Sequence, residues 1–319
     1  MNMRKIFTLI VSSMLISYCS LAQQEAQFSQ NMFNQMAINP GVAGSTNSIC
    51  ATALYRQQWV GFKDIDGNKG APETMMITAH GPVKLLKGGL GLGIMSDKLG
   101  FEKNLGVKLS YAYRLANLWT GNLGIGLQVG FLNKSVDFDK FKPIELDDPL
   151  LSTKGSQKDM LTDLGFGVYY SIPNKIYFGL SSSQLIENKG DFGKAEISLK
   201  RHYYVTAGYN YALPSNPSFE LEPSFFIKSD ATSTQIDLNL LVEYNKKFWG
   251  GIGYRTTDAA VVLIGINYKD FRFGYSYDIT TSAMGKNGRS SGSHEIMLGY
   301  CFKIQKDAVI ESNRNVRFL

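Results

Sequence analysis

The sequence predicts an all-β fold, a 14-stranded antiparallel transmembrane β-barrel of the outer-membrane type, and three observations lead to it. Segments of about ten residues alternate apolar and polar side chains, as strands do between lipid and lumen. The chain is rich in Gly, Tyr and Phe (32, 17 and 19 residues), as expected of a barrel with aromatic girdles. A mean hydropathy of −0.12, with no long apolar run after the N-terminus, argues against helical spans.

The first 22 residues have the pattern of a signal peptide. A basic start and an apolar stretch precede Ser20-Leu21-Ala22, whose small residues suit a cleavage site. The apolar stretch is shorter than the roughly 20 residues of a spanning helix. A lipoprotein beginning at Cys19 is the alternative, but Tyr18 stands where a small residue is needed. We therefore expect residues 1–22 to be removed and the protein to reside in the outer membrane.

Charge excludes one class of partner. Removal of Arg4 and Lys5 with the leader lowers the formal net charge from +6 to +4. This surplus is small, and no Lys/Arg-rich run accompanies it, so nucleic acid is not an expected partner.

Strand alternation is clearest in three segments. In 104–115 the odd positions are apolar or aromatic, and in 235–244 and 271–278 one face is likewise apolar while the other carries polar residues or glycine. A helix would need apolar residues at spacings of three and four, which are missing. Fourteen segments follow this pattern: 50–60, 72–80, 88–96, 103–115, 120–132, 161–172, 175–183, 201–212, 218–228, 235–244, 248–255, 260–268, 271–278 and 294–303.

The connections predict the topology independently. An even strand number places both termini on the periplasmic side, where turns are short. The longest connections, 133–160, 184–200 and 279–293, all then fall on the extracellular side. On the periplasmic side we expect a docking face formed by the turn 84–87 and a tail, 304–319, although girdle anchoring or disorder would explain these segments equally well.

The segment 23–48 precedes the first strand of the barrel, 49–303, and is too apolar for a free tail. Asn39-Pro40-Gly41 is a turn signal within it. We expect this segment to fold into the periplasmic mouth or lumen as a plug. Many inward positions of the predicted strands are glycine, which either relieves curvature of the wall or lets plug backbone pack against it. The inward charges have both signs, unlike the one-signed constriction of a selective porin.

No catalytic or metal constellation is present in the sequence, so we expect a protein that is not an enzyme and needs no cofactor or metal. The three histidines are scattered over three strands, and no zinc-ligand spacing occurs. An acidic run in the longest loop, 145–148, could bind calcium, but a solvated loop is the simpler interpretation.

Two cysteines remain after cleavage. Cys50 and Cys301 lie at the periplasmic ends of the first and last strands, which pair when the barrel closes. Antiparallel partners stand within disulfide reach, and the periplasm is oxidising. A disulfide across the seam is therefore predicted, although the stagger of the barrel could offset the two residues.

Three stretches carry a family resemblance. They are 27–34 (QFSQNMFN) with 38–44 (INPGVAG), 55–59 (YRQQW) in the first strand, and 293–298 (SHEIML) in the last. Together they resemble the PorP/SprF family over about 27–303, although Gly41 and Val42 depart from the usual residues. On this resemblance the plug or partner-binding residues would include Phe28, Ser29, Gln30, Met32, Phe33, Asn39, Pro40 and Gly44.

The resemblance implies a non-enzymatic outer-membrane component of the type IX secretion system, used in protein export and in some members for gliding motility. It also implies an architecture similar to fatty-acid-transporter barrels. The implied partners are periplasmic lipoprotein and ring subunits, a peptidoglycan-associated subunit, cargo C-terminal sorting domains and outer-membrane lipid. The alternative function is transport of small hydrophobic molecules through a lateral or luminal path.

Overall fold

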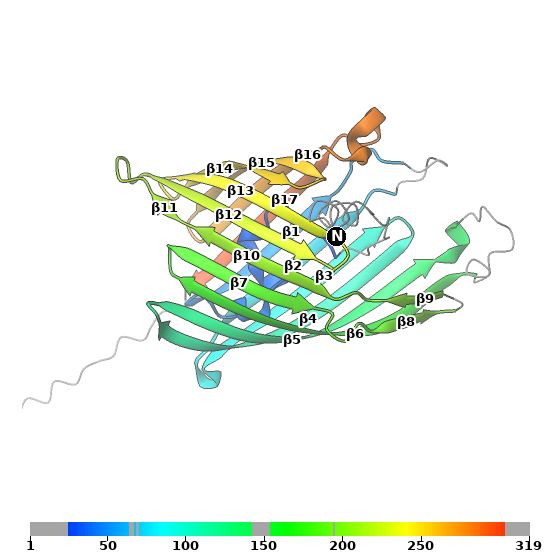
Figure 1. The fold of residues 1–319 in the computed structure, drawn as a ribbon, viewed down its shortest axis with the longest axis horizontal. Helices are drawn as coiled ribbons and strands as arrows, with labels where there is room; N and C mark the ends of the chain where they lie inside the picture. Colours follow the sequence, from blue (N-terminus) through cyan, green and yellow to red (C-terminus); the bar gives the residue numbers. More distant parts are fainter. Residues whose placement is uncertain (1–24, 64–66, 68–69, 142–153, 194, 304–319) are drawn as a thin grey trace, which may run out of the picture.

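The computed structural model describes residues 25–63, 67, 70–141, 154–193 and 195–303, and shows a closed antiparallel β-barrel (Figure 1). The predicted leader and tail lie outside these residues. The barrel strands are β1 (Ser48–Gln57), β2 (Glu73–Val83), β3 (Gly88–Leu99), β4 (Glu102–Leu118), β5 (Gly121–Asp137), β6 (Ser156–Ile172), β7 (Ile176–Ser183), β10 (His202–Tyr209), β11 (Tyr211–Ala212), β12 (Phe219–Ser229), β13 (Thr234–Tyr244), β14 (Phe248–Arg255), β15 (Ala259–Tyr268), β16 (Phe271–Thr280) and β17 (Ser293–Lys303).

The predicted strand number is confirmed. β10 and β11 occupy one position in the wall, interrupted at Asn210, and both pair with β12, so the barrel has fourteen strand positions. Every strand pairs with its neighbours in sequence order, and β1 closes the ring against β17 with Ser48 opposite Lys303 and Gln57 opposite His294. Complete closure leaves no unpaired edge, which is the condition for a sheet in lipid. Among the described residues, no helix has the length and apolarity to cross a membrane.

Alternation along each strand separates two environments. On β13 the outward side chains, such as Leu238 and Leu240, are exposed, whereas the intervening Asp237, Asn239 and Glu243 are buried. An exposed apolar surface that encircles the molecule suits a lipid solvent, and the buried polar face lines the lumen. The predicted faces of 104–115, 235–244 and 271–278 are all found in this arrangement.

The two ends of the barrel differ. One end, here called the short-turn end, carries the connection 84–87, which contains helix η4 (Lys84–Leu86), and five others: 119–120, 173–175, 213–218, 245–247 and 269–270. The opposite end, the loop end, carries helices η5 (Phe138–Lys140) and η7 (Ala283–Gly288) and the hairpin of β8 (Lys189–Phe192) and β9 (Ala195–Ser198). Figure 1 shows the loop end on the right.

Two predicted loops are more ordered than expected. The connection placed at 133–160 is shortened, because β5 and β6 stay paired from Asn133–Met160 out to Asp137–Ser156. The segment 184–200 contains the β8–β9 hairpin. Beyond the barrel wall, Val136, Phe138 and Phe192 form a small buried cluster. This cluster supplies the apolar contacts that an exposed hairpin needs, and single-strand alternation gives no sign of it.

A disulfide joins Cys50 and Cys301, which are direct register partners across the β1–β17 seam. We expect the bond in the protein isolated from its membrane. Mass spectrometry of a non-reduced digest should therefore detect the peptides of β1 and β17 as one cross-linked species, which separates on reduction. Two free thiols in the non-reduced protein would contradict this expectation.

Candidate functional site: an internal segment and its anchors

Residues 25–47, here called the internal segment, run through the lumen from the loop end to the start of β1 (Figure 1). The segment has no strand partner and forms three short 3₁₀ helices, η1 (Asn31–Phe33), η2 (Gln35–Ala37) and η3 (Pro40–Val42). Single 3₁₀ turns satisfy only part of the backbone. The remaining polar groups need partners on the lumen wall.

The main anchor is a buried ion cluster, here called the anchor cluster: Ser29, Arg56, Arg255, Asp278 and Glu295. Each of these residues is at most 1% exposed. Arg56 lies 2.9 Å from Asp278 and 3.3 Å from Glu295, and Arg255 lies 2.8 Å from Asp278. Two arginines therefore face two carboxylates, with Asp237 also 3.1 Å from Arg255.

The internal segment enters this cluster through its backbone and one hydroxyl. The amides of Ser29 and Gln30 donate to the two oxygens of Glu295 at 2.7 and 2.8 Å. The Ser29 hydroxyl contacts Asp278 at 2.7 Å, and Arg56 and Arg255 both donate to its oxygen. Charge-assisted hydrogen bonds of this kind are stronger than neutral ones and fix geometry as well as energy.

The anchor cluster unites the three stretches that carry the family resemblance. Ser29 comes from the first, Arg56 from the second and Glu295 from the third, although they lie up to 266 residues apart in sequence. The second and third stretches meet again where the Trp59 amide donates to the Ser293 hydroxyl at 3.1 Å. The signature therefore describes one connected structure, the attachment of the internal segment to the seam.

Aromatic contacts hold the middle of the internal segment. The rings of Phe33 and Trp249 lie 4.8 Å apart, and the Arg272 guanidinium lies 4.6 Å from the Phe33 ring. The Thr78 hydroxyl donates to Asn34 at 2.6 Å. Phe28 and Met32 pack, partly buried, against the same hydrophobic cluster.

Asn39 shapes the turn that follows. Its side-chain oxygen caps η3 by accepting from the Gly41 amide at 2.8 Å, and its side-chain nitrogen donates to the Val168 carbonyl at 3.0 Å. Arg114 donates to the Gly41 carbonyl at 3.1 Å. The segment then reaches Gly44, whose positive φ of 67° suits glycine and whose amide donates to His80.

The wall glycines divide into two groups. A Cβ at Gly91, Gly124, Gly126, Gly167 or Gly274 would lie 2.1–2.3 Å from an atom of the internal segment. Gly93, Gly106, Gly130, Gly165 and Gly208 have their nearest neighbours elsewhere in the wall. Close packing of the internal segment therefore explains half of the inward glycines that the sequence singled out.

Replacing Gly126 by valine should destabilise the protein by about 1–3 kcal/mol, the usual cost of overpacking. The added Cβ would stand 2.3 Å from the Pro40 carbonyl carbon, an atom that cannot rotate away. Gly93→Val is the matched control, because a Cβ there has no neighbour closer than 3.8 Å. Urea unfolding in lipid vesicles measures both, and equal stabilities would contradict the packing explanation.

The loop-end part of the internal segment is held at Glu25. Its carboxylate lies 3.4 Å from the Lys108 ammonium, accepts from Gln184 at 3.1 Å and is hydrogen-bonded by the Tyr204 hydroxyl. A cavity of about 650 Å³ lies at the loop end, and cavities of about 1000 and 300 Å³ lie toward the short-turn end. Residues of the internal segment line all three, so the segment separates the two mouths.

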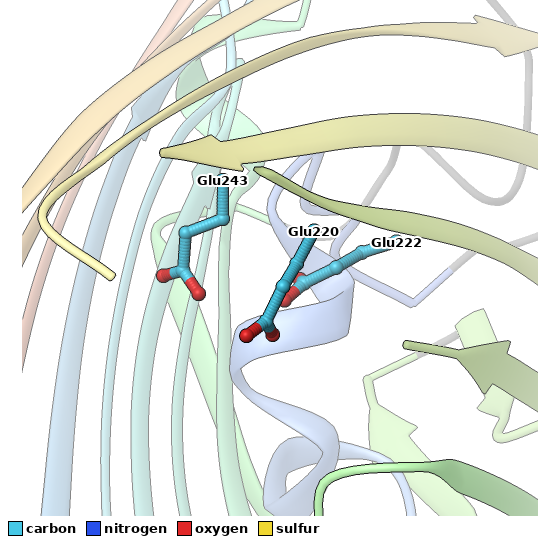
Figure 2. Close-up of side chains that lie close together, drawn as sticks. All are labelled: Glu220, Glu222 and Glu243. Atoms are coloured by element: carbon cyan, nitrogen blue, oxygen red, sulfur yellow. The ribbon is translucent and has the colours of Figure 1, made fainter. Parts of the chain in front are cut away.

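Carboxylates of Glu220, Glu222 and Glu243 converge at the short-turn end of β12 and β13 (Figure 2). Their oxygens lie within 4.8 Å of one another. Lys246 lies 3.4 Å from Glu220, and Arg272 lies 3.8 Å from Glu243. These cations offset only part of the charge, so this side of the mouth is acidic.

Sequence reasoning missed two members of the site, Arg255 and Trp249. Both lie on β14, whose alternation through two glycines places them on the inward face, the feature that could have revealed them. His80, expected at a strand end, instead lies within β2 opposite Cys50 and contacts the internal segment. The acidic run 145–148 lies outside the described residues.

Solved structures with a similar fold are outer-membrane proteins. They include the Ralstonia pickettii toluene transporter TbuX (10% identity, 85% of this chain and 93% of that chain, TM-score 0.49). The P. putida toluene transporter TodX (7%, 84% and 93%, 0.46) and the Acinetobacter baumannii outer membrane protein Omp33 (8%, 81% and 99%, 0.42) are further examples. No curated protein matches the sequence.

The family comparison gives a direct assignment. The model of the family described as "Type IX secretion system membrane protein PorP/SprF" matches residues 20–300, which is most of the chain. The matched region contains all three signature stretches and every residue of the anchor cluster. The chain therefore belongs to the PorP/SprF family of type IX secretion system membrane proteins and is an outer-membrane β-barrel.

Proposed function

We propose that this barrel works without enzymatic chemistry as a docking platform of the type IX secretion system, presenting a fixed periplasmic face to the secretion machinery and to cargo C-terminal sorting domains. The observation that carries this proposal is the attachment of the internal segment to the lumen wall from Glu25 to Gly44. A mobile plug would suit a gated channel. A segment anchored by buried ion pairs suits a rigid support.

The internal segment also contributes to the face that would meet the machinery. Its residues 44–47 line the cavity at the short-turn end, beside the turn 84–87. We assign this end to the periplasm, because short turns lie there in bacterial outer-membrane barrels. Leu85 in that turn is 91% exposed, which is more than the lipid-facing residues of the strands.

A deletion strain tests the secretion role. Proteins with C-terminal sorting domains should accumulate in its periplasm and disappear from the cell surface and the culture fluid, and the intact gene should restore them. Normal export combined with failed uptake of a small hydrophobic compound would overturn the proposal in favour of the transporter alternative.

Photo-cross-linking locates the docking face. A cross-linking residue at Leu85, on the short-turn end, should capture periplasmic subunits or exported cargo in cells. The matched position is Ile186 on the loop end, which is also exposed and should capture neither. Capture of these proteins from Ile186 alone would mean that the docking face is on the wrong end.

A further inference from the structure

The cavity at the short-turn end has an unusual charge. Among the residues that line its volume of about 1000 Å³ are four cations, Lys84, Lys87, Arg114 and Lys175, and no carboxylate. Residues 44–47 of the internal segment also line it. We call this cavity the basic vestibule.

The cations of the basic vestibule have no acidic partner among the described residues. None of the four takes part in an ion pair there, and Arg114 donates only to the neutral Gly41 carbonyl. Lys84, Lys87 and Lys175 are exposed. Like charges gathered in a cleft with low-dielectric walls raise the local concentration of an oppositely charged partner.

The same mouth is acidic further round the ring. The carboxylates of Glu220, Glu222 and Glu243 lie on β12 and β13, whereas the basic vestibule lies along β2 to β7 (Figure 2). A separation of charge within one opening favours one orientation of a charged partner and disfavours the reverse. Electrostatic complementarity of this kind gives specificity and speed of association more than affinity.

We propose that the basic vestibule binds an acidic polypeptide segment of a periplasmic partner protein. This inference deepens the docking function proposed above and rests on it. A polypeptide fits better than a lipid headgroup, because the vestibule is also lined by the buried Tyr169 and by the internal segment, inside the ring of strands. An occupant must therefore enter along the barrel axis.

The test uses the purified full-length barrel in detergent and a fluorescein-labelled peptide of eight aspartates, with binding followed by fluorescence anisotropy. The triple variant K84E/K87E/K175E should weaken binding roughly tenfold or more, because several exposed charge pairs are lost together. Added salt should weaken binding to the wild-type protein as well, through screening. Arg114 is left intact because it holds the internal segment.

The matched control is K98E/K103E, which reverses two exposed lysines at the loop end and should bind the peptide like the wild type. Equal loss in both variants, or equal binding of an octa-serine peptide, would overturn the inference. So would binding of anionic phospholipid vesicles in place of the peptide. If peptide binding fails although deletion blocks export, only this inference falls; normal export in the deletion strain would instead refute the docking function.

Discussion

Replacing Arg56 by methionine is expected to lower the free energy of unfolding by about 3–5 kcal/mol, the cost of leaving a buried charge without its partner. Arg56 is the only described residue in an ion pair with Glu295, and both side chains are at most 2% exposed. Asp278 would keep Arg255, so the loss falls mainly on Glu295. Urea unfolding in lipid vesicles, followed by tryptophan fluorescence, gives the free energy directly.

Arg272→Met is the matched control for this experiment. Arg272 also faces the lumen, but its side chain is 38% exposed and its carboxylate partner is 3.8 Å away. An exposed pair contributes about 1 kcal/mol or less, and the stacking on Phe33 adds a similar amount. Equal destabilisation by the two substitutions would mean that the anchor cluster has no special role.

A double variant separates charge from packing. In Arg56→Met/Glu295→Gln the uncompensated carboxylate is gone, while the Gln carbonyl can still accept from the Ser29 or Gln30 amide. We therefore expect the double variant to recover at least about 1 kcal/mol of the loss, since removing both partners of a buried pair costs far less than removing one. No recovery would place the effect of Arg56 in its packing alone.

Much of the barrel was predictable because its physics is local. In lipid, every second side chain of a strand must be apolar, and this rule reads directly from segments such as 235–244. The seam was predictable for a related reason: closure fixes β1 against β17, so that two cysteines at matching strand ends become register partners. The β8–β9 hairpin lies beyond the membrane, where this constraint does not act.

The anchor cluster was only partly predictable. Alternation places Arg56, Asp278 and Glu295 inside the barrel, but it says nothing of which inward charges meet. That depends on the stagger of the strands and on the internal segment, which has no periodicity. Arg255 shows the limit well, because it is the last residue of its strand and only the closed ring brings it to Asp278.

Deleting residues 25–46 should convert a barrel with little or no conductance into an open channel in planar bilayers. A 14-stranded barrel is intermediate between small barrels filled by side chains and the 16- to 18-stranded porins that hold water. Its lumen is occupied here by the internal segment, which contacts wall glycines that have no side chains of their own. Removal of the segment exposes a wall with polar and charged residues, which water and ions can enter.

A variant of equal length identifies the cause of closure. Replacing residues 25–46 with a Gly/Ser linker keeps the chain but removes Ser29, Phe33 and Asn39, the contacts with the anchor cluster, Trp249 and the Val168 carbonyl. If the anchored side chains keep the lumen shut, this variant should conduct as the deletion does. A folded deletion that stays closed would show that the wall residues collapse into the lumen. In that case the inward glycines would serve the curvature of the wall, and the anchor cluster would fix the shape of the docking face without sealing a pore.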